Sequence, residues 1–276
     1  MSTDLFLYAN GDSFVEGCEL GDFLLPDYPG AYDFDEPLDG PNRAGVREWF
    51  ENIHKPETDL WYTRHKLIQQ IKHQEQQRNF TTKLAKLLSA KFYNNALGGC
   101  GMDRIVRTTI SDLIEFKKTR KNIVAVIGTA EPLRMELPSK NVEPPLWGLY
   151  HPGNSVSDPV LNTVVGFHYV YTKNYHKMVG FYQRVIAIQD FCKANGIKLL
   201  WVSGNAPIVD VIRVEPEYDT QRDLCALRDY ANFKPHVDME QVARQLHYKV
   251  RLPGYHFSES VHEATAQKLY EHIQGL

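Results

Sequence analysis

The sequence contains little cysteine. Its 276 residues include only four cysteines, and no two of them form a CxxC pair: Cys18, Cys100, Cys192 and Cys225. Such wide spacing excludes a zinc ribbon or a dense disulfide framework. We therefore expect free thiols in a reducing compartment.

Long hydrophobic stretches and a secretory leader are also missing. No apolar run approaches the ~20 residues that a membrane span needs. The segment from Met1 to Ala9 lacks the basic start and the apolar length of a signal peptide. These absences predict a cytoplasmic protein that has no membrane contact.

The sequence has no excess of positive charge and no nucleotide-binding motif. Lys and Arg total 31 against 34 Asp and Glu, which gives a net charge of −3. This balance provides no general attraction for nucleic acid or anionic lipid. Neither GxxxxGK[ST] nor GxGxxG occurs, so we expect no nucleotide site. We expect no metal site either.

Short apolar runs alternate with amphipathic segments along the chain. Four runs are typical of buried parallel strands: Leu5–Ala9, Phe92–Ala96, Ile123–Ile127 and Ile197–Val202. Four segments have helical periodicity: Thr82–Ala90, Asp103–Lys118, Tyr175–Ala194 and His262–Ile273. Alternation of this kind predicts a single α/β domain over residues 1–276, with a mostly parallel sheet covered by helices on both faces.

Three segments interrupt the alternation, at about 22–60, 131–174 and 205–236. We expect insertions here. They are either lids and binding loops or surface decoration. The first two are rich in proline and aromatic residues, including Tyr28, Tyr32, Phe34 and Trp147.

The first apolar run ends at Gly11-Asp12-Ser13-Phe14. A strand that stops here places a serine hydroxyl at the carboxyl edge of the sheet, where ligands bind in open α/β sheets. If a helix follows, the Ser13 N–H lies near its positive end and can stabilise an oxyanion. The alternative is a plain strand-to-helix turn with Asp12 or Ser13 as the N-cap.

Two further turns leave predicted strands at the same edge. Gly98, Gly99 and Gly101 allow a close approach of the backbone to a ligand, and the N–H groups of such a turn are anion donors. After the third strand, Thr129 and Arg134 are candidates to face the pocket. Arg134 is equally suited to pair with a neighbouring glutamate.

A serine nucleophile needs a base. Among eleven histidines, His256 stands out because Gly254–Ser258 forms a tight loop directly before the last helix. From there an imidazole can reach across the sheet edge. Ser258 can cap the helix, and His262 is interpreted as a residue that either supports the site from behind His256 or packs in the core. The alternative for His256 is a surface loop histidine.

Along the chain, the Gly-Asp-Ser turn follows the first predicted strand, the glycine turn follows the second, the Gly-Thr turn follows the third, and the histidine loop comes last. Motifs in this order resemble the SGNH/GDSL hydrolase family, and the resemblance covers essentially the whole chain. It is nearest to a divergent branch from bacteriophages and bacteria, with an Asp103–Arg107 segment that matches that branch's xDRIxR helix. The resemblance implies a flavodoxin-like three-layer α/β/α sandwich and ester hydrolysis without a cofactor. Ser13 then matches the nucleophile, the Ser13 and Gly99 N–H groups match oxyanion donors, and His256 matches the base.

Two positions depart from the family pattern. The family's oxyanion asparagine falls on Ala130, so Thr129 or Arg134 has to replace its contact. The aspartate expected three residues before the histidine falls on Pro253. A backbone carbonyl or a distant acid, such as one from 205–236, then orients His256, or nothing does.

The sequence therefore predicts a serine esterase or deacylase that acts on a small-molecule or glycan acyl ester. Ser13 and His256 carry the reaction, and Asp12, Thr129 and Arg134 bind the substrate. An O-acetylated carbohydrate suits the aromatic insertions. The alternative is a catalytically silent scaffold that binds a glycan or a protein, for example in a virion. Acyl transfer to a sugar hydroxyl would use the same acyl-enzyme.

Overall fold

The computed structural model describes residues 4–31, 41–132, 134–138, 147–150, 163, 174–204, 222–246, 251–253 and 256–275. A parallel five-stranded sheet lies at its centre, in the order β2-β1-β3-β6-β7. The strands are β1 (Leu5–Asn10), β2 (Lys91–Asn94), β3 (Asn122–Thr129), β6 (Lys198–Ser203) and β7 (Val237–Asp238). A separate antiparallel pair joins β4 (Met135–Pro138) to β5 (Trp147–Tyr150).

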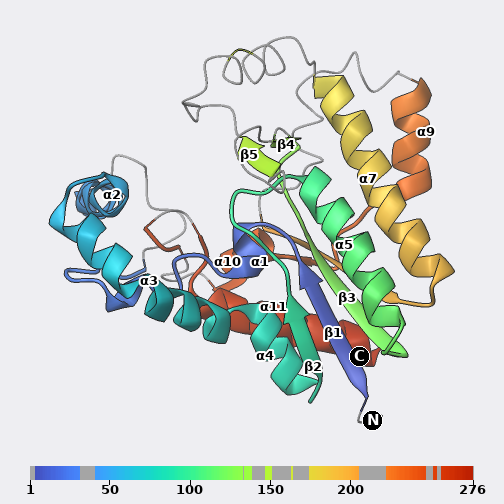
Figure 1. The fold of residues 1–276 in the computed structure, drawn as a ribbon, viewed down its shortest axis with the longest axis horizontal. Helices are drawn as coiled ribbons and strands as arrows, with labels where there is room; N and C mark the ends of the chain where they lie inside the picture. Colours follow the sequence, from blue (N-terminus) through green and yellow to red (C-terminus); the bar gives the residue numbers. More distant parts are fainter. Residues whose placement is uncertain are drawn as a thin grey trace.

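Helices cover both faces of the sheet (Figure 1). On one face lie α5 (Met102–Lys117), α7 (Asn174–Ala194) and α9 (Arg222–Ala231). On the other lie α4 (Phe80–Leu87), α10 (Met239–Leu246) and α11 (Glu259–Gln274). The α/β architecture with three layers that the sequence predicts is therefore confirmed.

Side-chain alternation along the strands produces these two faces. In β1, Phe6 and Tyr8 join the core beneath α5 and α7, whereas Leu7 and Ala9 join the core beneath α4 and α11. Successive residues of a strand point to opposite faces, so a strand that is covered on both sides must be apolar throughout. This is why the apolar runs identified the central strands.

The strand at 92–96 is not buried as expected. It forms β2 at the edge of the sheet, pairing only with β1 among the described strands, and Phe92 and Tyr93 are 43% and 44% exposed. An apolar run can form a half-exposed edge strand because its sequence alone does not reveal how many neighbours it has.

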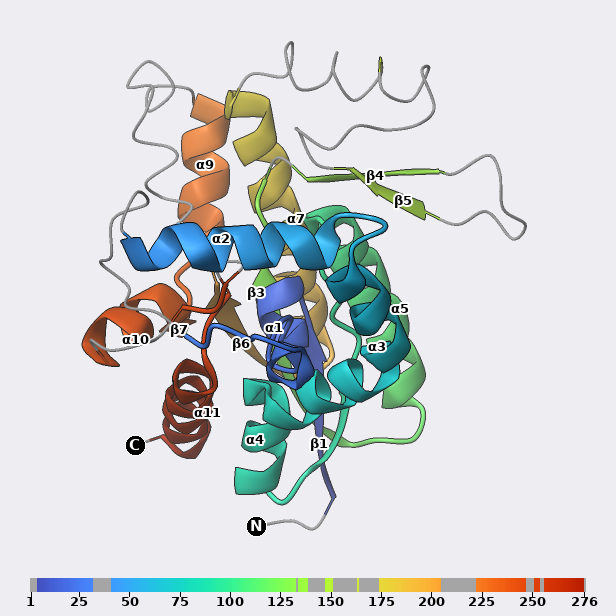
Figure 2. The ribbon, with the colours of Figure 1, turned by 90° about the vertical axis from the view of Figure 1, so that its left-hand side faces the viewer.

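Two segments expected to be irregular contain regular structure. The region 205–236 includes α9, whose Leu224 and Ala231 are buried in the core that α7 shares. The region 22–60 includes a 3₁₀ turn, η1 (Asp22–Leu24), and α2 (Pro41–His54), followed by α3 (Asp59–Arg78). Figure 1 shows α2 and α3 together at one side of the sheet, and Figure 2 views the molecule from that side.

The helices α2 and α3 have a small core of their own. Leu25, Trp49, Ile53 and Ile71 are buried together in it, and Tyr28 packs edge-on against Trp49 with 5.4 Å between ring centroids. Tyr28 therefore stabilises the packing of α2. Tyr32, Phe34 and the side chain of Trp147 lie outside the described residues.

All four cysteines are free thiols. The Cys100 thiol is buried and donates to the Gly11 carbonyl at 3.1 Å, and burial raises its pKa to about 12. A thiol in this state is a packing group. Among the described residues no helix combines the length and apolar character needed to cross a bilayer.

Candidate active site

Ser13 begins α1 (Ser13–Glu16), a single helical turn at the carboxyl end of β1. The Asp12 side chain caps this turn by accepting a hydrogen bond from the Phe14 N–H at 3.1 Å, and Gly17 ends the turn at φ 86°. Asp12 is thus the N-cap that the sequence allowed. Ser13 is 7% exposed, and its hydroxyl makes no hydrogen bond within the described residues.

Glycines let α1 lie directly on the ends of β1 and β3. A Cβ on Gly128 would stand 2.2 Å from Val15 Cγ2, and one on Gly11 would stand 2.4 Å from the same atom. No side chain larger than hydrogen fits at these distances. The position of Ser13 is therefore fixed by the strands beneath it.

The glycine turn after β2 lies beside Ser13. A Cβ built on Gly98 would be 3.6 Å from the Ser13 Cβ, and the Leu97 N–H donates to the Gly11 carbonyl at 3.1 Å. Gly99 has φ 78°, and a Cβ there would meet nothing within 4 Å. The Gly98 N–H donates to Glu16 Oε2 at 2.5 Å. The Gly98 amide is therefore already bonded, and the space beside the Gly99 Cα is open.

His256 reaches the same region from the other end of the chain. Its loop is closed by a bridge between Arg251 and Phe257 and by the Leu252 N–H, which donates to the His256 carbonyl at 2.8 Å. The imidazole lies 5.1 Å from the Phe14 ring, measured between centroids. Among the described residues no hydrogen bond joins His256 to Ser13.

The sequence did not identify the acid that accompanies His256. Glu19 Oε2 lies 3.3 Å from His256 Nδ1, and the two side chains are 6% and 21% exposed. Burial lowers the pKa of His256, but the carboxylates of Glu19, Asp12 and Glu75 outweigh it and hold that pKa above its ordinary value. Only a structure could reveal Glu19, because its proximity depends on a turn and not on a motif.

Arg134 pairs with Asp12, with 3.3 Å between Nη1 and Oδ2, and lies 3.9 Å from Glu131. Asp12 is 1% exposed, so it has no surface to offer a substrate. Burial raises its pKa to about 6 despite the neighbouring guanidinium. This differs from the substrate-binding role expected for Asp12. Arg134 is thus in ion-pair contact with Asp12 and Glu131, and its substrate-binding role stays a prediction.

The remaining predicted positions lie inside the protein. Thr129 ends β3 and is 4% exposed, and Ala130, which follows it, is 1% exposed. Neither offers a side-chain donor at the surface. Ser258 stands at the N-cap of α11, but its side chain makes no capping bond and instead contacts the Ser260 hydroxyl at 2.8 Å.

His262 is part of the core, as expected. It is 1% exposed and accepts a hydrogen bond from the Phe80 N–H at 3.1 Å through Nδ1. Burial lowers its pKa to about 3, so this imidazole stays neutral. Its role is to accept the hydrogen bond from the first N–H group of α4.

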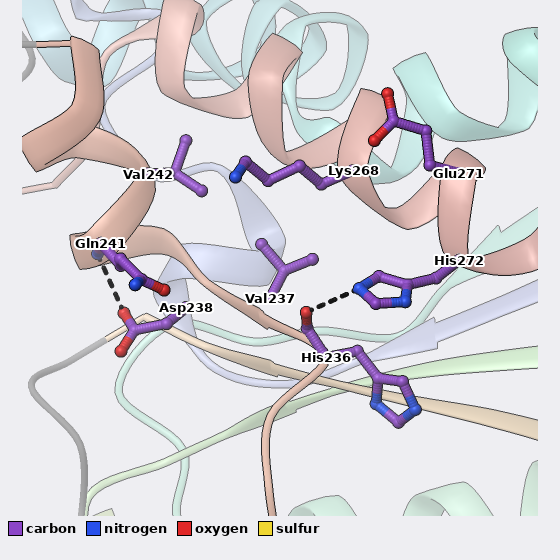
Figure 3. Close-up of a pocket in the computed structure, with 8 residues that line it drawn as sticks. All are labelled: His236, Val237, Asp238, Gln241, Val242, Lys268, Glu271 and His272. Atoms are coloured by element: carbon purple, nitrogen blue, oxygen red, sulfur yellow. Dashed lines mark hydrogen bonds between the residues drawn. The ribbon is translucent and has the colours of Figure 1, made fainter. Parts of the chain in front are cut away.

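A cavity of about 210 Å³ lies elsewhere, between β7, α10 and α11 (Figure 3). It is lined by His236, Val237, Asp238, Gln241, Val242, Lys268, Glu271 and His272. Its polar groups already contact one another: His272 Nε2 meets the His236 carbonyl at 3.0 Å, and Asp238 accepts from the Gln241 N–H at 3.2 Å. No member belongs to the Ser13 region. Within the described residues no group of acids, histidines and cysteines suits a metal ion.

Comparison with known proteins gives structural neighbours only. No family model matches the chain, and no curated protein matches it. A member of the lipolytic G-D-S-L family from Veillonella parvula is 12% identical, with 99% of this chain and 100% of that chain covered and a TM-score of 0.43. An acetylxylan esterase from Geobacillus stearothermophilus is 11% identical, covering 97% and 93%, with a TM-score of 0.44.

An acetyl xylan esterase from Butyrivibrio proteoclasticus is 14% identical, with 100% of this chain and 65% of that chain covered and a TM-score of 0.45. At such low identities and TM-scores, assignment of a function depends on the site itself.

Proposed function

We propose that the chain is a serine ester hydrolase with Ser13 as nucleophile and His256 as general base. One juxtaposition carries the proposal. Ser13 begins a helical turn at one rim of the sheet, and a Cβ built on Gly98 of the neighbouring glycine turn would stand 3.6 Å from the Ser13 Cβ. His256, from the far end of the chain, borders the same rim. These are the parts that acyl transfer needs.

In the proposed reaction, His256 takes the Ser13 Oγ proton while Oγ bonds to the acyl carbon. The carbonyl electron pair moves to oxygen, where the Ser13 and Gly99 amides stabilise the charge. The intermediate collapses, and the alcohol leaves with the proton from His256. Water then gives a proton to His256 and attacks the acyl carbon in the same way, which releases the acid, and His256 returns the proton to the Ser13 oxygen.

We expect the Ser13 hydroxyl and the His256 imidazole to come within hydrogen-bond distance when substrate binds. Ser13 and His256 are not hydrogen-bonded in the described structure, and catalytic hydrogen bonds commonly tighten in the substrate complex. Ser13 is 7% exposed, so the site accepts a small acyl group at its base more readily than a long chain. An acetyl ester, such as that of an O-acetylated carbohydrate, is therefore the substrate that we propose.

A fluorophosphonate probe with mass spectrometry tests the nucleophile. We expect an adduct on Ser13 in the wild type, none there in Ser13→Ala, and slower labelling in His256→Ala. Ser111→Ala is the matched control, because Ser111 is exposed on α5. Ser13→Ala is expected to hydrolyse p-nitrophenyl acetate and acetylated sugars at least about a thousandfold more slowly. Equal turnover by wild type and Ser13→Ala refutes the proposal.

A catalytically silent scaffold is the second candidate, and the environment of Ala130 favours it. The family's side-chain oxyanion donor is missing there, and Arg134 is held by Asp12. Loss of one such donor costs about 3 kcal/mol of transition-state stabilisation. A folded wild type that gives no Ser13 adduct at any pH would favour this second function.

A further inference from the structure

We propose that Glu19 positions His256, holding Nδ1 so that Nε2 serves as the base toward Ser13. The inference rests on the function proposed above. It assigns the role of orienting acid to a residue close to the nucleophile in sequence, whereas the position three residues before the histidine is a buried proline, Pro253.

The first support is the contact itself. Glu19 Oε2 lies 3.3 Å from His256 Nδ1, and that buried nitrogen has no hydrogen-bond partner of good geometry among the described residues. A hydrogen bond to this carboxylate would satisfy the buried nitrogen. An Nδ1–H held by a carboxylate fixes the tautomer that leaves the Nε2 lone pair free.

The second support is that Glu19 is itself fixed. Its backbone is in the left-handed region at φ 70°, which a residue with a side chain seldom adopts. The Glu19 N–H donates to Glu75 Oε1 at 2.9 Å, and the Glu19 carbonyl accepts from the Asp22 N–H at 3.1 Å. Bonds on both sides of the residue hold this turn and aim the carboxylate at the loop of His256.

Charged groups from several elements face this pair. Asp12, Asp22 and Glu75 are acids near His256. The positive charge of His256 also lowers the pKa of two histidines, His54 and His262. Arg134 and Arg64 partly neutralise Asp12 and Asp22, with nitrogen–oxygen distances of 3.3 and 3.7 Å. Glu19 is the only one of these acids in ion-pair contact with the His256 ring among the described residues.

The test replaces Glu19 by glutamine, which keeps the shape and removes the charge. In Glu19→Gln we expect kcat to fall by roughly 100- to 10,000-fold. We also expect the acid limb of the kcat/KM profile to move to lower pH, because the imidazole loses the anion that favours its protonated form. Glu19→Asp keeps the charge at a longer distance, so it should retain part of kcat and a pH profile close to that of the wild type.

A direct measurement separates this inference from the proposed function. The pKa of His256, followed by NMR in histidine-labelled protein, should fall by about one unit or more in Glu19→Gln. It should not change in Glu259→Gln, the matched control, whose carboxylate pairs with Arg78 and Lys83. This readout does not require turnover.

The outcomes are distinct. If Ser13→Ala is inactive but Glu19→Gln matches the wild type in kcat to within about twofold and in the pKa of His256, the inference about Glu19 is wrong and the hydrolase stands. If Ser13→Ala retains full activity, the hydrolase proposal itself fails, whatever Glu19 does. A His256 pKa that falls in Glu19→Gln without any loss of kcat overturns the positioning role.

Discussion

At the scale of single residues, the site depends on how tightly α1 packs against the strands. Val15 is 1% exposed and meets Gly11 and Gly128 at the ends of β1 and β3. Because Ser13 is two residues from Val15 in the same turn, anything that moves Val15 also moves the hydroxyl.

Gly128→Ala should therefore disturb stability and site together. The new Cβ would stand 2.2 Å from Val15 Cγ2, so α1 has to lift. We expect a loss of about 1–3 kcal/mol in urea unfolding and slower fluorophosphonate labelling of Ser13. Gly45→Ala in α2 is the control, since a Cβ there meets nothing within 4 Å. Wild-type stability in Gly128→Ala would show that α1 is not held by this contact.

At the scale of elements, α4 and α11 are joined by a buried bond and exposed ion pairs. The Phe80 N–H, at the start of α4, donates to His262 Nδ1 at 3.1 Å. Around it, Lys83 reaches Glu259 and Glu263 at 2.7 and 2.9 Å. Partly exposed ion pairs contribute little, so the buried bond matters most.

His262→Ala should cost about 2–4 kcal/mol of unfolding free energy, because it leaves a buried amide unpaired and opens a cavity. His262→Asn is the matched variant, since its amide oxygen can replace Nδ1 as the acceptor, and a smaller loss is expected. Chemical denaturation of both variants measures the difference. Equal losses would mean that packing alone, and not the Phe80 bond, determines the effect.

Adjacency in sequence explains which elements were predictable. The runs at 5–9, 123–127 and 197–202 are apolar because both faces of β1, β3 and β6 are buried. Ser13 and the glycine turn could be placed because each directly follows a strand, and parallel strands end at one edge. The strand β7 has two residues, too few for any periodicity. Glu19 could not be found, because a left-handed turn and its burial leave no pattern in the sequence.

At the scale of the whole molecule, buried ionisable groups set how stability varies with pH. Burial raises the pKa of Asp12 and Asp22 to about 6 and that of Glu75 to about 7. Their folded forms bind protons that the unfolded chain releases, so stability falls as pH rises through these values. His262, with a pKa of about 3, acts in the opposite direction and removes stability as pH falls below about 6.5. Stability should therefore be greatest at mildly acidic pH.

Glu75→Gln isolates one of these contributions. Glu75 is 5% exposed, and burial, opposed by its bond to the Glu19 N–H, raises its pKa from 4.5 to about 7. Below about pH 4.5 both folded and unfolded states hold the proton. Between about pH 4.5 and pH 7 only the folded state holds it. The free energy of unfolding of the wild type therefore falls by up to about 3 kcal/mol by about pH 8.

The glutamine in Glu75→Gln cannot titrate, yet its amide oxygen still accepts from Glu19. Urea unfolding from about pH 5 to pH 8 should give a shallower decline in Glu75→Gln than in the wild type. Glu51→Gln, an exposed acid paired with Arg47, should leave the decline unchanged. If the wild type and Glu75→Gln decline in parallel, Glu75 is already ionised in the folded protein. His256 would then face a fully charged Glu75 carboxylate at neutral pH, and not one that is partly protonated.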